Sequence, residues 1–349
     1  MRARGTSGNP PNRFERLRSV PLPEEEAGRE QRNPDTQLLR DPSRSIVATN
    51  QSPDVGFDAS INPYRGCEHG CTYCYARPTH EYLGFSAGLD FETRILVKER
   101  APELLRARLS ARSWRPQVVA LSGVTDAYQP AERRLGITRR CLAVLLEFRN
   151  PVTVVTKSHL VTRDADLLRE LAGFGAASVC VSVTSLDAEL QRRMEPRAAP
   201  PHRRIAAIEA LAAAGVPVGV LVAPIVPGLT DHEVPRILAA AAAAGARFAG
   251  RVVLRLPHGV KEVFGDWLTA HFPERKEKVL NRLRALHGGK LYDPSFGHRQ
   301  RGAGEFAEQI DALFQLGMRR AGLEKRSWAL STAAFRVPGR SEQLGLFAE

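Results

Sequence analysis

Between residues 117 and 257 the sequence alternates between short apolar runs rich in β-branched residues and longer segments with helical periodicity. The apolar runs read QVVALSG, PVTVVTKS, ASVCVSVTS, VPVGVLVAPIVPG and RVVLRLP. Nearly continuous runs of this kind are typical of parallel strands covered on both faces. Together with a first strand expected near residues 57–62, they make about six strand–helix units. The pattern predicts an α/β fold with a parallel sheet, either doubly wound or closing toward a barrel.

The two ends of the chain differ from this central region. Residues 1–55 are rich in Pro, Arg, Asn and Glu without a sustained apolar period, which predicts a mostly flexible N-terminal extension. We expect the core over residues 56–260 and a basic, helical C-terminal extension over residues 261–349. Half of the net charge of +12 lies in residues 251–349. This surplus suits a polyanionic partner such as nucleic acid, although a soluble Arg-rich protein would carry it equally well.

Several features bear on the cellular compartment. No stretch approaches the roughly 18 uninterrupted apolar residues that a membrane helix needs. The N-terminal sequence MRARGTSGNPPNRFERLRSV has basic residues but no apolar run after them, unlike a secretory signal. The five cysteines are few, odd in number and partly clustered, which argues against a disulfide framework. We therefore expect a cytoplasmic protein without a membrane partner.

Three of the five cysteines lie in INPYRGCEHGCTYCYARP, residues 61–78, directly after the first expected strand. Cys67, Cys71 and Cys74 follow the spacing C-x3-C-x2-C at the carboxyl end of that strand, where α/β folds bind ligands. A structural zinc site would need a fourth ligand, which His69 or His80 would have to supply. Three thiolates suit instead a four-iron cluster in which one iron keeps an open coordination position.

The other two cysteines are expected to be structural. Cys141 lies on the apolar face of an expected helix, and Cys180 lies in an expected strand. Buried cysteines of this kind behave as small apolar residues. We therefore predict that neither contributes to the cysteine cluster.

The spacing C-x3-C-x2-C, with an aromatic residue just before the last cysteine, resembles the signature of radical S-adenosylmethionine (SAM) enzymes. SINPYRGCEHGCTYCYARP followed by SGVTDAYQPAE looks like the branch related to spore photoproduct lyase, often labelled DNA repair photolyases. The resemblance covers roughly residues 55–260 and implies a partial, six-unit (β/α) barrel. It implies that the three cysteines hold three irons of a 4Fe-4S cluster and that SAM chelates the fourth. One electron would then cleave SAM into a 5′-deoxyadenosyl radical, which takes a hydrogen atom from the substrate.

Polar residues expected just beyond the strand ends are candidates for binding SAM. In the superfamily the region after the second strand contacts the amino group of the cofactor, and here Asp126 takes that position unless it only caps a helix. Arg197 is a candidate partner for the cofactor carboxylate because of its bidentate geometry. The candidate cofactor-binding residues are Thr125, Asp126, Lys157, Ser182, Thr184 and Arg197.

Tyr73 and Tyr75, on either side of Cys74, match tyrosines of the lyase's CxYCY pattern and are the candidate catalytic residues. The lyase also uses an additional cysteine near its second strand, and the stretch VVALSGVTDAY contains none. Reversal of the same lesion is therefore not implied, whereas a radical step on nucleic acid, DNA above all, agrees with the basic C-terminal third. The alternatives are a radical enzyme acting on protein, RNA or a small molecule, and a cluster-bearing binding or sensor protein. Turnover would also require an electron donor.

The last residues, SEQLGLFAE, contain a short apolar motif. Gln343, Leu344, Leu346 and Phe347 resemble the QL-x-LF peptide by which bacterial DNA repair and replication proteins hold the sliding clamp. In that mode Leu346 and Phe347 would anchor in one apolar pocket of the clamp. The alternative is that this tail docks back on its own barrel.

Overall fold

The computed structural model describes residues 4–15, 34–323 and 329–339. The sliding-clamp prediction for Gln343, Leu344, Leu346 and Phe347 concerns residues outside this part of the chain and stays a prediction. In the described residues, no helix combines the length and the apolar character needed to cross a membrane.

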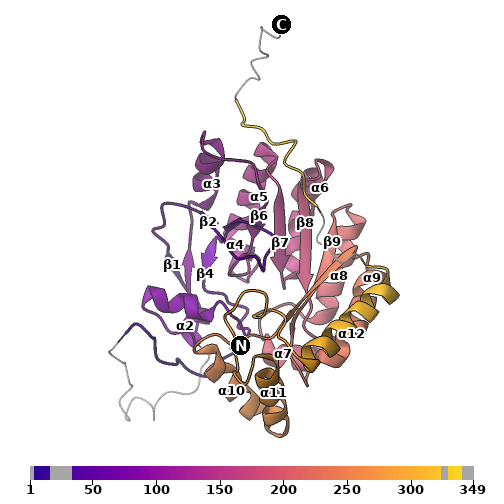
Figure 1. Cartoon of the computed structure of the whole chain (residues 1–349). Coiled ribbons are helices and arrows are strands. Elements are labelled where there is room, and N and C mark those ends of the chain that lie inside the picture. Colours follow the sequence, from indigo (N-terminus) through magenta and orange to yellow (C-terminus); the bar gives the residue numbers. More distant parts are fainter. Residues whose placement is uncertain (1–3, 16–33, 324–328, 340–349) are drawn as a thin grey trace.

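The centre of the fold is a twisted, mainly parallel sheet (Figure 1). Six strands pair in parallel in the order β10-β9-β8-β7-β6-β3. The strands are β3 (Ala59–Ile61), β6 (Val119–Leu121), β7 (Val152–Thr156), β8 (Ala177–Ser182), β9 (Val218–Ile225) and β10 (Phe248–Val253). The predicted α/β class and the six parallel strands are confirmed.

Helices cover the sheet after most of these strands. They are α3 (Ala101–Ser110), α4 (Glu132–Leu135), α5 (Ile137–Phe148), α6 (Ala165–Gly173), α8 (Pro201–Ala213) and α9 (Val234–Ala243). In α5 the buried residues Ile137, Cys141, Leu145 and Phe148 recur at helical spacing, so one face of the helix packs on the sheet. Shorter helical segments are η1 (Arg77–Leu83), α2 (Leu89–Thr93), η2 (His159–Asp164), α7 (Ala188–Met194) and η3 (Asp231–Glu233).

The expectation of a flexible extension over residues 1–55 needs correction for its described residues. β2 (Val47–Thr49) adds to the main sheet antiparallel to β3. β1 (Gln37–Arg40) pairs with β5 (Arg94–Val97), which also pairs with β4 (Tyr64–Arg65), in a second sheet of three strands. Local composition did not reveal these strands because both are short and mostly exposed, so they lack an apolar period.

The C-terminal region is helical, as predicted, with α10 (Val260–His271), α11 (Pro273–Leu286) and α12 (Glu305–Ala321). α12 packs on α9, and its residues Ile310, Phe314 and Met318 belong to the main apolar core. α10 and α11 form a second apolar core that also includes Cys71 and Tyr73. These helices therefore help to enclose the cysteine-containing segment.

Candidate active site at the cysteine loop

The cysteine loop, residues 66–76, follows β4 and depends on two glycines. Gly66 and Gly70 have positive φ angles of 82° and 67°, a backbone conformation that favours glycine. A Cβ atom on Gly66 would lie 3.0 Å from side chains of His80 and Ile95, and one on Gly70 would lie 2.7 Å from Oε2 of Glu92. Both glycines are therefore needed for the loop to pack closely against His80, Ile95 and Glu92.

The three cysteines of the loop are free thiols. Cys67 and Cys71 are buried, and Cys74 is half-buried. Burial raises the pKa of the Cys67 thiol, and the neighbouring charges of Asp126, Cys71 and Cys74 raise it further. Three close thiols held on one loop fit an iron–sulfur cluster, since each thiolate in such a cluster binds its own iron.

The zinc alternative finds no support in the two candidate histidines. Nδ1 of His69 lies 3.4 Å from a carboxylate oxygen of Asp126. Nε2 of His80 lies 2.9 Å from the carbonyl oxygen of Arg94. Within the described residues, no three His, Cys, Asp or Glu side chains are grouped so as to hold a single metal ion.

The remaining cysteines lie elsewhere. Cys141 is fully buried in α5 and belongs to the main apolar core, as expected for a structural cysteine. Cys180 lies in β8, as expected, but is only half-buried. Both residues are therefore suitable controls for the three cysteines of the loop.

A buried ion pair supports the loop from below. Arg77 and Glu92 have fully buried side chains, and Nη2 of Arg77 lies 2.6 Å from Oε1 of Glu92. Nε of Arg77 donates to the carbonyl oxygen of Cys71 at 2.9 Å. Gln129 holds the beginning of the cysteine loop in place. Its side-chain amide donates to the carbonyl of Gly66 and accepts from the backbone N–H of Glu68. Sequence reasoning missed these residues, since Arg77 and Gln129 act on backbone atoms of the loop and Glu92 acts through Arg77.

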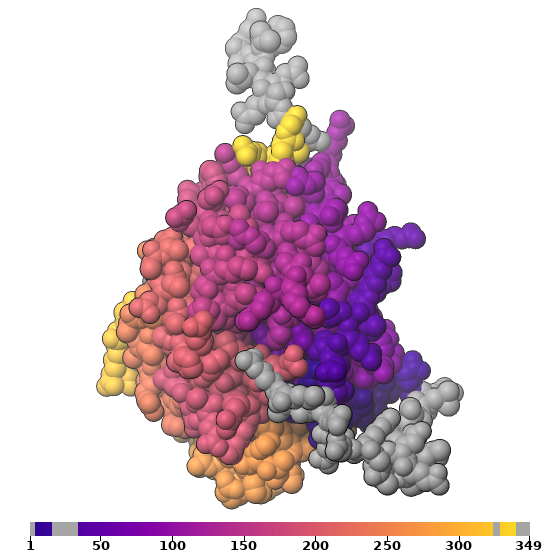
Figure 2. Space-filling view, turned by 180° about the vertical axis from the view of Figure 1, so that it is seen from behind, coloured from indigo at the N-terminus to yellow at the C-terminus, as the bar shows by residue number. Residues whose placement is uncertain are grey.

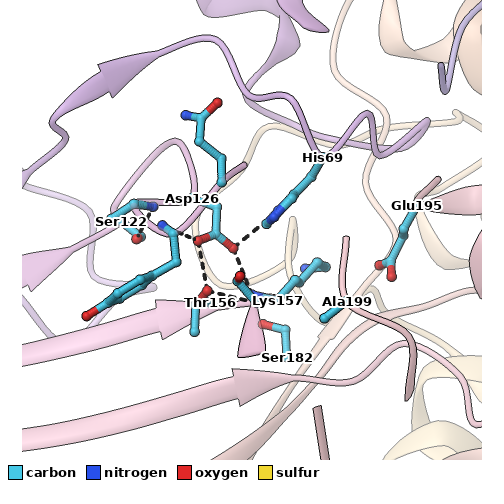
Figure 3. Close-up of polar contacts among 12 residues, drawn as sticks. His69, Ser122, Asp126, Thr156, Lys157, Ser182, Glu195 and Ala199 are labelled. Atoms are coloured by element: carbon cyan, nitrogen blue, oxygen red, sulfur yellow. Dashed lines mark hydrogen bonds and ion pairs between the residues drawn. The ribbon is translucent and has the colours of Figure 1, made fainter. Parts of the chain in front are cut away.

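Asp126, in the loop after β6, joins three segments at the carboxyl ends of the strands, here called the mouth (Figure 3). Its carboxylate accepts a hydrogen bond from Oγ1 of Thr156 at 2.8 Å and from the backbone N–H of Lys157 at 2.7 Å. It also faces His69 of the cysteine loop and accepts from the backbone N–H of Tyr128 at 2.9 Å. The carboxylate is thus close to the cysteine loop, and it also stabilises a turn at Tyr128. It does not cap the following helix α4, whose N-cap residue is Ala131 and receives no side-chain hydrogen bond.

A second buried carboxylate, Glu195, lies at the mouth and was not recognised from the sequence. Its side chain pairs with the buried guanidinium of Arg204 and accepts hydrogen bonds from Tyr73 and Thr184. Burial alone would raise the pKa of Glu195, but the charges of Arg204 and Lys157 and the bonds from Arg204 and Tyr73 outweigh it and lower the pKa to about 2. The stretch RRMEPRAAP contains this single acid, whereas the only residue of that stretch predicted to bind the cofactor was Arg197.

The structure brings most of the predicted cofactor residues to the mouth. Ser182, the last residue of β8, and Thr184, just beyond it, are buried. Nζ of Lys157 lies 5.9 Å from the ring centre of Tyr73. Arg197 instead pairs with Glu68 at 3.1 Å. The hydroxyl of Thr125 donates to the carbonyl of Tyr64 at 2.7 Å.

The two tyrosines beside Cys74 have different surroundings. The hydroxyl of Tyr73 is buried against Glu195, as described above. Tyr75 is 42% exposed, and its hydroxyl donates to the carbonyl of Gly123 at 3.0 Å. The guanidinium carbon of Arg255, just after β10, lies 4.0 Å from the centre of the Tyr75 ring. Tyr73 therefore belongs to the buried site, and Tyr75 to its solvent-facing rim.

The fold and the site define an α/β protein that gathers three free thiols and a set of buried charges at the carboxyl ends of its parallel strands. The chain belongs to the radical SAM superfamily, whose family model matches residues 61–241. This confirms the resemblance inferred from the cysteine motif.

Two uncharacterized proteins are similar to half of the chain or more. The uncharacterized protein Rv2578c of Mycobacterium tuberculosis (strain ATCC 25618 / H37Rv) is 38% identical over 255 residues, which are 71% of this chain and 74% of that protein. The uncharacterized protein MJ0683 of Methanocaldococcus jannaschii is 30% identical over 173 residues, 50% of this chain and 62% of that protein.

Among solved structures, the fold is similar to that of spore photoproduct lyase complexed with dinucleoside spore photoproduct. The TM-score is 0.57, and the match covers 81% of this chain and 79% of that chain at 16% sequence identity. At this identity the likeness concerns the fold alone. It agrees with the predicted arrangement of a parallel sheet with helices around it.

Proposed function

We propose that the protein is a radical SAM enzyme that holds a 4Fe-4S cluster through Cys67, Cys71 and Cys74 and cleaves SAM reductively. The observation that carries the proposal is the set of three free thiols on one loop beside a mouth lined by buried charges. When bound, the cluster supplies the electron that cleaves SAM into methionine and a 5′-deoxyadenosyl radical.

The chain's own residues would hold, orient and enclose the reactants. Arg77 and Glu92 keep the loop backbone in place. Asp126 carries the negative charge suited to the amino group of SAM, and Lys157 and Arg197 carry the positive charges suited to its carboxylate. The apolar core formed with α10 and α11 excludes water from the side of the loop that carries Cys71.

The proposal is tested by anaerobic reconstitution of the cluster, followed by addition of dithionite and SAM. We expect 5′-deoxyadenosine to form, and its amount can be measured by chromatography. A protein that binds its full complement of iron but forms no 5′-deoxyadenosine would support the alternative of a binding or sensor protein.

SAM affinity tests the assignment of the cofactor residues. Replacement of Asp126 or Arg197 by Ala is expected to weaken SAM binding by about 1.5 to 3 kcal/mol each, the usual effect of losing a charge-assisted hydrogen bond. Equilibrium binding to the iron-loaded protein measures this effect, and the iron content should not change. Glu147→Ala is the control, since this acid lies at the end of α5, before β7 begins. Wild-type affinity in both variants would leave these residues with only structural roles.

We further propose that the substrate is a nucleic acid, with a lyase-like reaction on DNA as the first candidate. The rim around Tyr75 supports this substrate class. Arg255 lies against the Tyr75 ring, and its Nε is buried with no hydrogen-bond partner among the described residues. Nearby, Arg299 pairs with Asp54 at 2.5 Å and lies 4.7 Å from the ring centre of Phe296, which is 57% exposed. Exposed rings for stacking and cations for phosphate are what single-stranded nucleic acids bind.

Binding of a fluorescent single-stranded DNA oligonucleotide tests this proposal. Arg255→Ala is expected to weaken binding by about 1 to 2 kcal/mol, because one cation and its contact with the ring are lost. Affinity should fall steeply with salt concentration, as fluorescence anisotropy would show.

The matched control is Arg112→Ala, which removes the same charge from an exposed residue between α3 and the start of β6, at the opposite end of the strands. It should change the affinity by less than about 0.5 kcal/mol. No retention of DNA by the wild-type protein at low salt would favour a protein or small-molecule substrate.

A further inference from the structure

The N-terminal residues 4–15 lie on the cysteine loop and the segments that support it. The backbone N–H of Gly5 donates to Oε2 of Glu92 at 2.8 Å, and the hydroxyl of Thr6 donates to Oε1 at 3.2 Å. Nη1 of Arg4 donates to the backbone carbonyl of Glu92 at 2.9 Å. Three consecutive residues near the start of the chain thus bind one residue of α2.

Glu92 is the same acid that pairs with Arg77 beneath the loop. Arg77 in turn donates to the carbonyl of Cys71. A short hydrogen-bonded path therefore runs from Gly5 through Glu92 and Arg77 to a cysteine of the loop. The N-terminal residues share in holding the conformation of the loop through this buried acid.

Gly5 also contacts the loop directly. A Cβ atom at this position would lie 1.7 Å from the carbonyl oxygen of Gly70, far closer than any real contact. Gly5 therefore allows a close backbone approach to the segment between Cys67 and Cys71 that no other residue permits. A Cβ atom on Gly8, three residues further on, would meet no atom within 4 Å.

The rest of the N-terminal segment makes several further hydrogen bonds to η1, α2 and the residues between them. The hydroxyl of Ser86 donates to the carbonyl of Pro10 at 2.6 Å, and the backbone N–H of Leu89 donates to the carbonyl of Gly8 at 3.1 Å. The amide of Asn12 donates to the carbonyls of Glu81 and Phe85, both at 2.9 Å.

The end of the segment reaches another part of the molecule. Arg13 pairs with Glu81 at 2.7 Å and lies 3.0 Å from the ring nitrogen of His258, just before α10. Figure 2 shows indigo N-terminal residues and the orange residues of the C-terminal helices at the same lower end of the molecule. The segment thus links η1 and α2 to the start of the C-terminal helices.

From these contacts we propose that residues 4–15 form a strap that locks the cysteine loop in its cluster-holding conformation and shields its thiols from solvent and oxidants. The role is one of positioning, because the strap acts on the loop through Glu92 and Gly70. It goes beyond the proposed function, since the loop is held in this way whether or not SAM is cleaved.

The test compares Gly5→Ala with Gly8→Ala in the reduced, metal-free protein. Iodoacetamide labelling of each cysteine is followed over time by mass spectrometry of peptides. We expect Gly5→Ala to raise the labelling rates of Cys67 and Cys71 by about tenfold or more, because the added methyl group forces the strap off Gly70 and opens the loop. Gly8→Ala should label at the wild-type rate. Trypsin should also cut faster after Arg4 and Arg13 in Gly5→Ala only.

Cys141, buried in the main core, reports whether the whole protein unfolds. Its labelling should stay slow in both variants, and an equal rise at Cys141 and Cys71 would overturn the proposal of a local strap. Deletion of residues 1–15 is a second variant, for which we expect the same selective labelling and faster loss of iron in air after reconstitution. Wild-type labelling rates in both Gly5→Ala and the deletion would also overturn the strap, even in a protein that cleaves SAM normally. A protein that takes up no cluster but shows the selective labelling would retain the strap and refute the proposed chemistry.

Discussion

Replacing Cys67, Cys71 or Cys74 by Ala is expected to abolish both cluster binding and SAM cleavage. Each thiolate would hold a different iron of the cluster, so a single loss leaves an iron without its protein ligand. The expected effect on 5′-deoxyadenosine formation is complete loss rather than a reduction. Iron and sulfide analysis after anaerobic reconstitution, together with the 5′-deoxyadenosine assay, measures the two effects separately.

Cys141→Ala and Cys180→Ala are the controls for this experiment. Both proteins should retain about four irons per chain and cleave SAM at the normal rate. Cys141 lies on the buried face of α5, and Cys180 lies within β8. If either control loses the cluster, the assignment of the three ligands is wrong.

Arg204→Met is expected to destabilise the metal-free protein by about 3 to 5 kcal/mol. The substitution leaves the carboxylate of Glu195 without its guanidinium partner in a buried position, and an uncompensated buried charge is costly. Both side chains of the pair are almost completely inaccessible to solvent. Urea denaturation followed by circular dichroism gives the free energy of unfolding of each protein.

Two further variants show whether burial is the cause. The double variant with Glu195→Gln removes the unpaired charge and should recover much of the lost stability. Arg106→Met breaks the pair of Arg106 with Glu147, whose side chains are 48% and 36% exposed, and should cost no more than about 1 kcal/mol. Equal losses for Arg204→Met and Arg106→Met would refute the argument from burial.

The amino-acid sequence by itself determined the class of fold and the grouping of three cysteines on one loop. Short β-branched runs such as PVTVVTKS predicted strands because the periodicity of burial is a local property of the chain. The C-x3-C-x2-C spacing predicted a shared site because residues so close in sequence cannot lie far apart. The proposal that Cys67, Cys71 and Cys74 hold the cluster therefore needed no coordinates.

Only the tertiary structure revealed which residues support that site. Glu195 is 122 positions from Tyr73, and Arg4 is 88 positions from Glu92, yet each pair is joined by a hydrogen bond. Their sequence neighbourhoods carry no sign of these partners, since a lone acid or arginine is usually a solvated surface residue. The sequence predicted a flexible N-terminal segment for the same reason. Its contacts depend on folded segments distant in the chain, and no local pattern encodes the proximity that the sheet and its loops create.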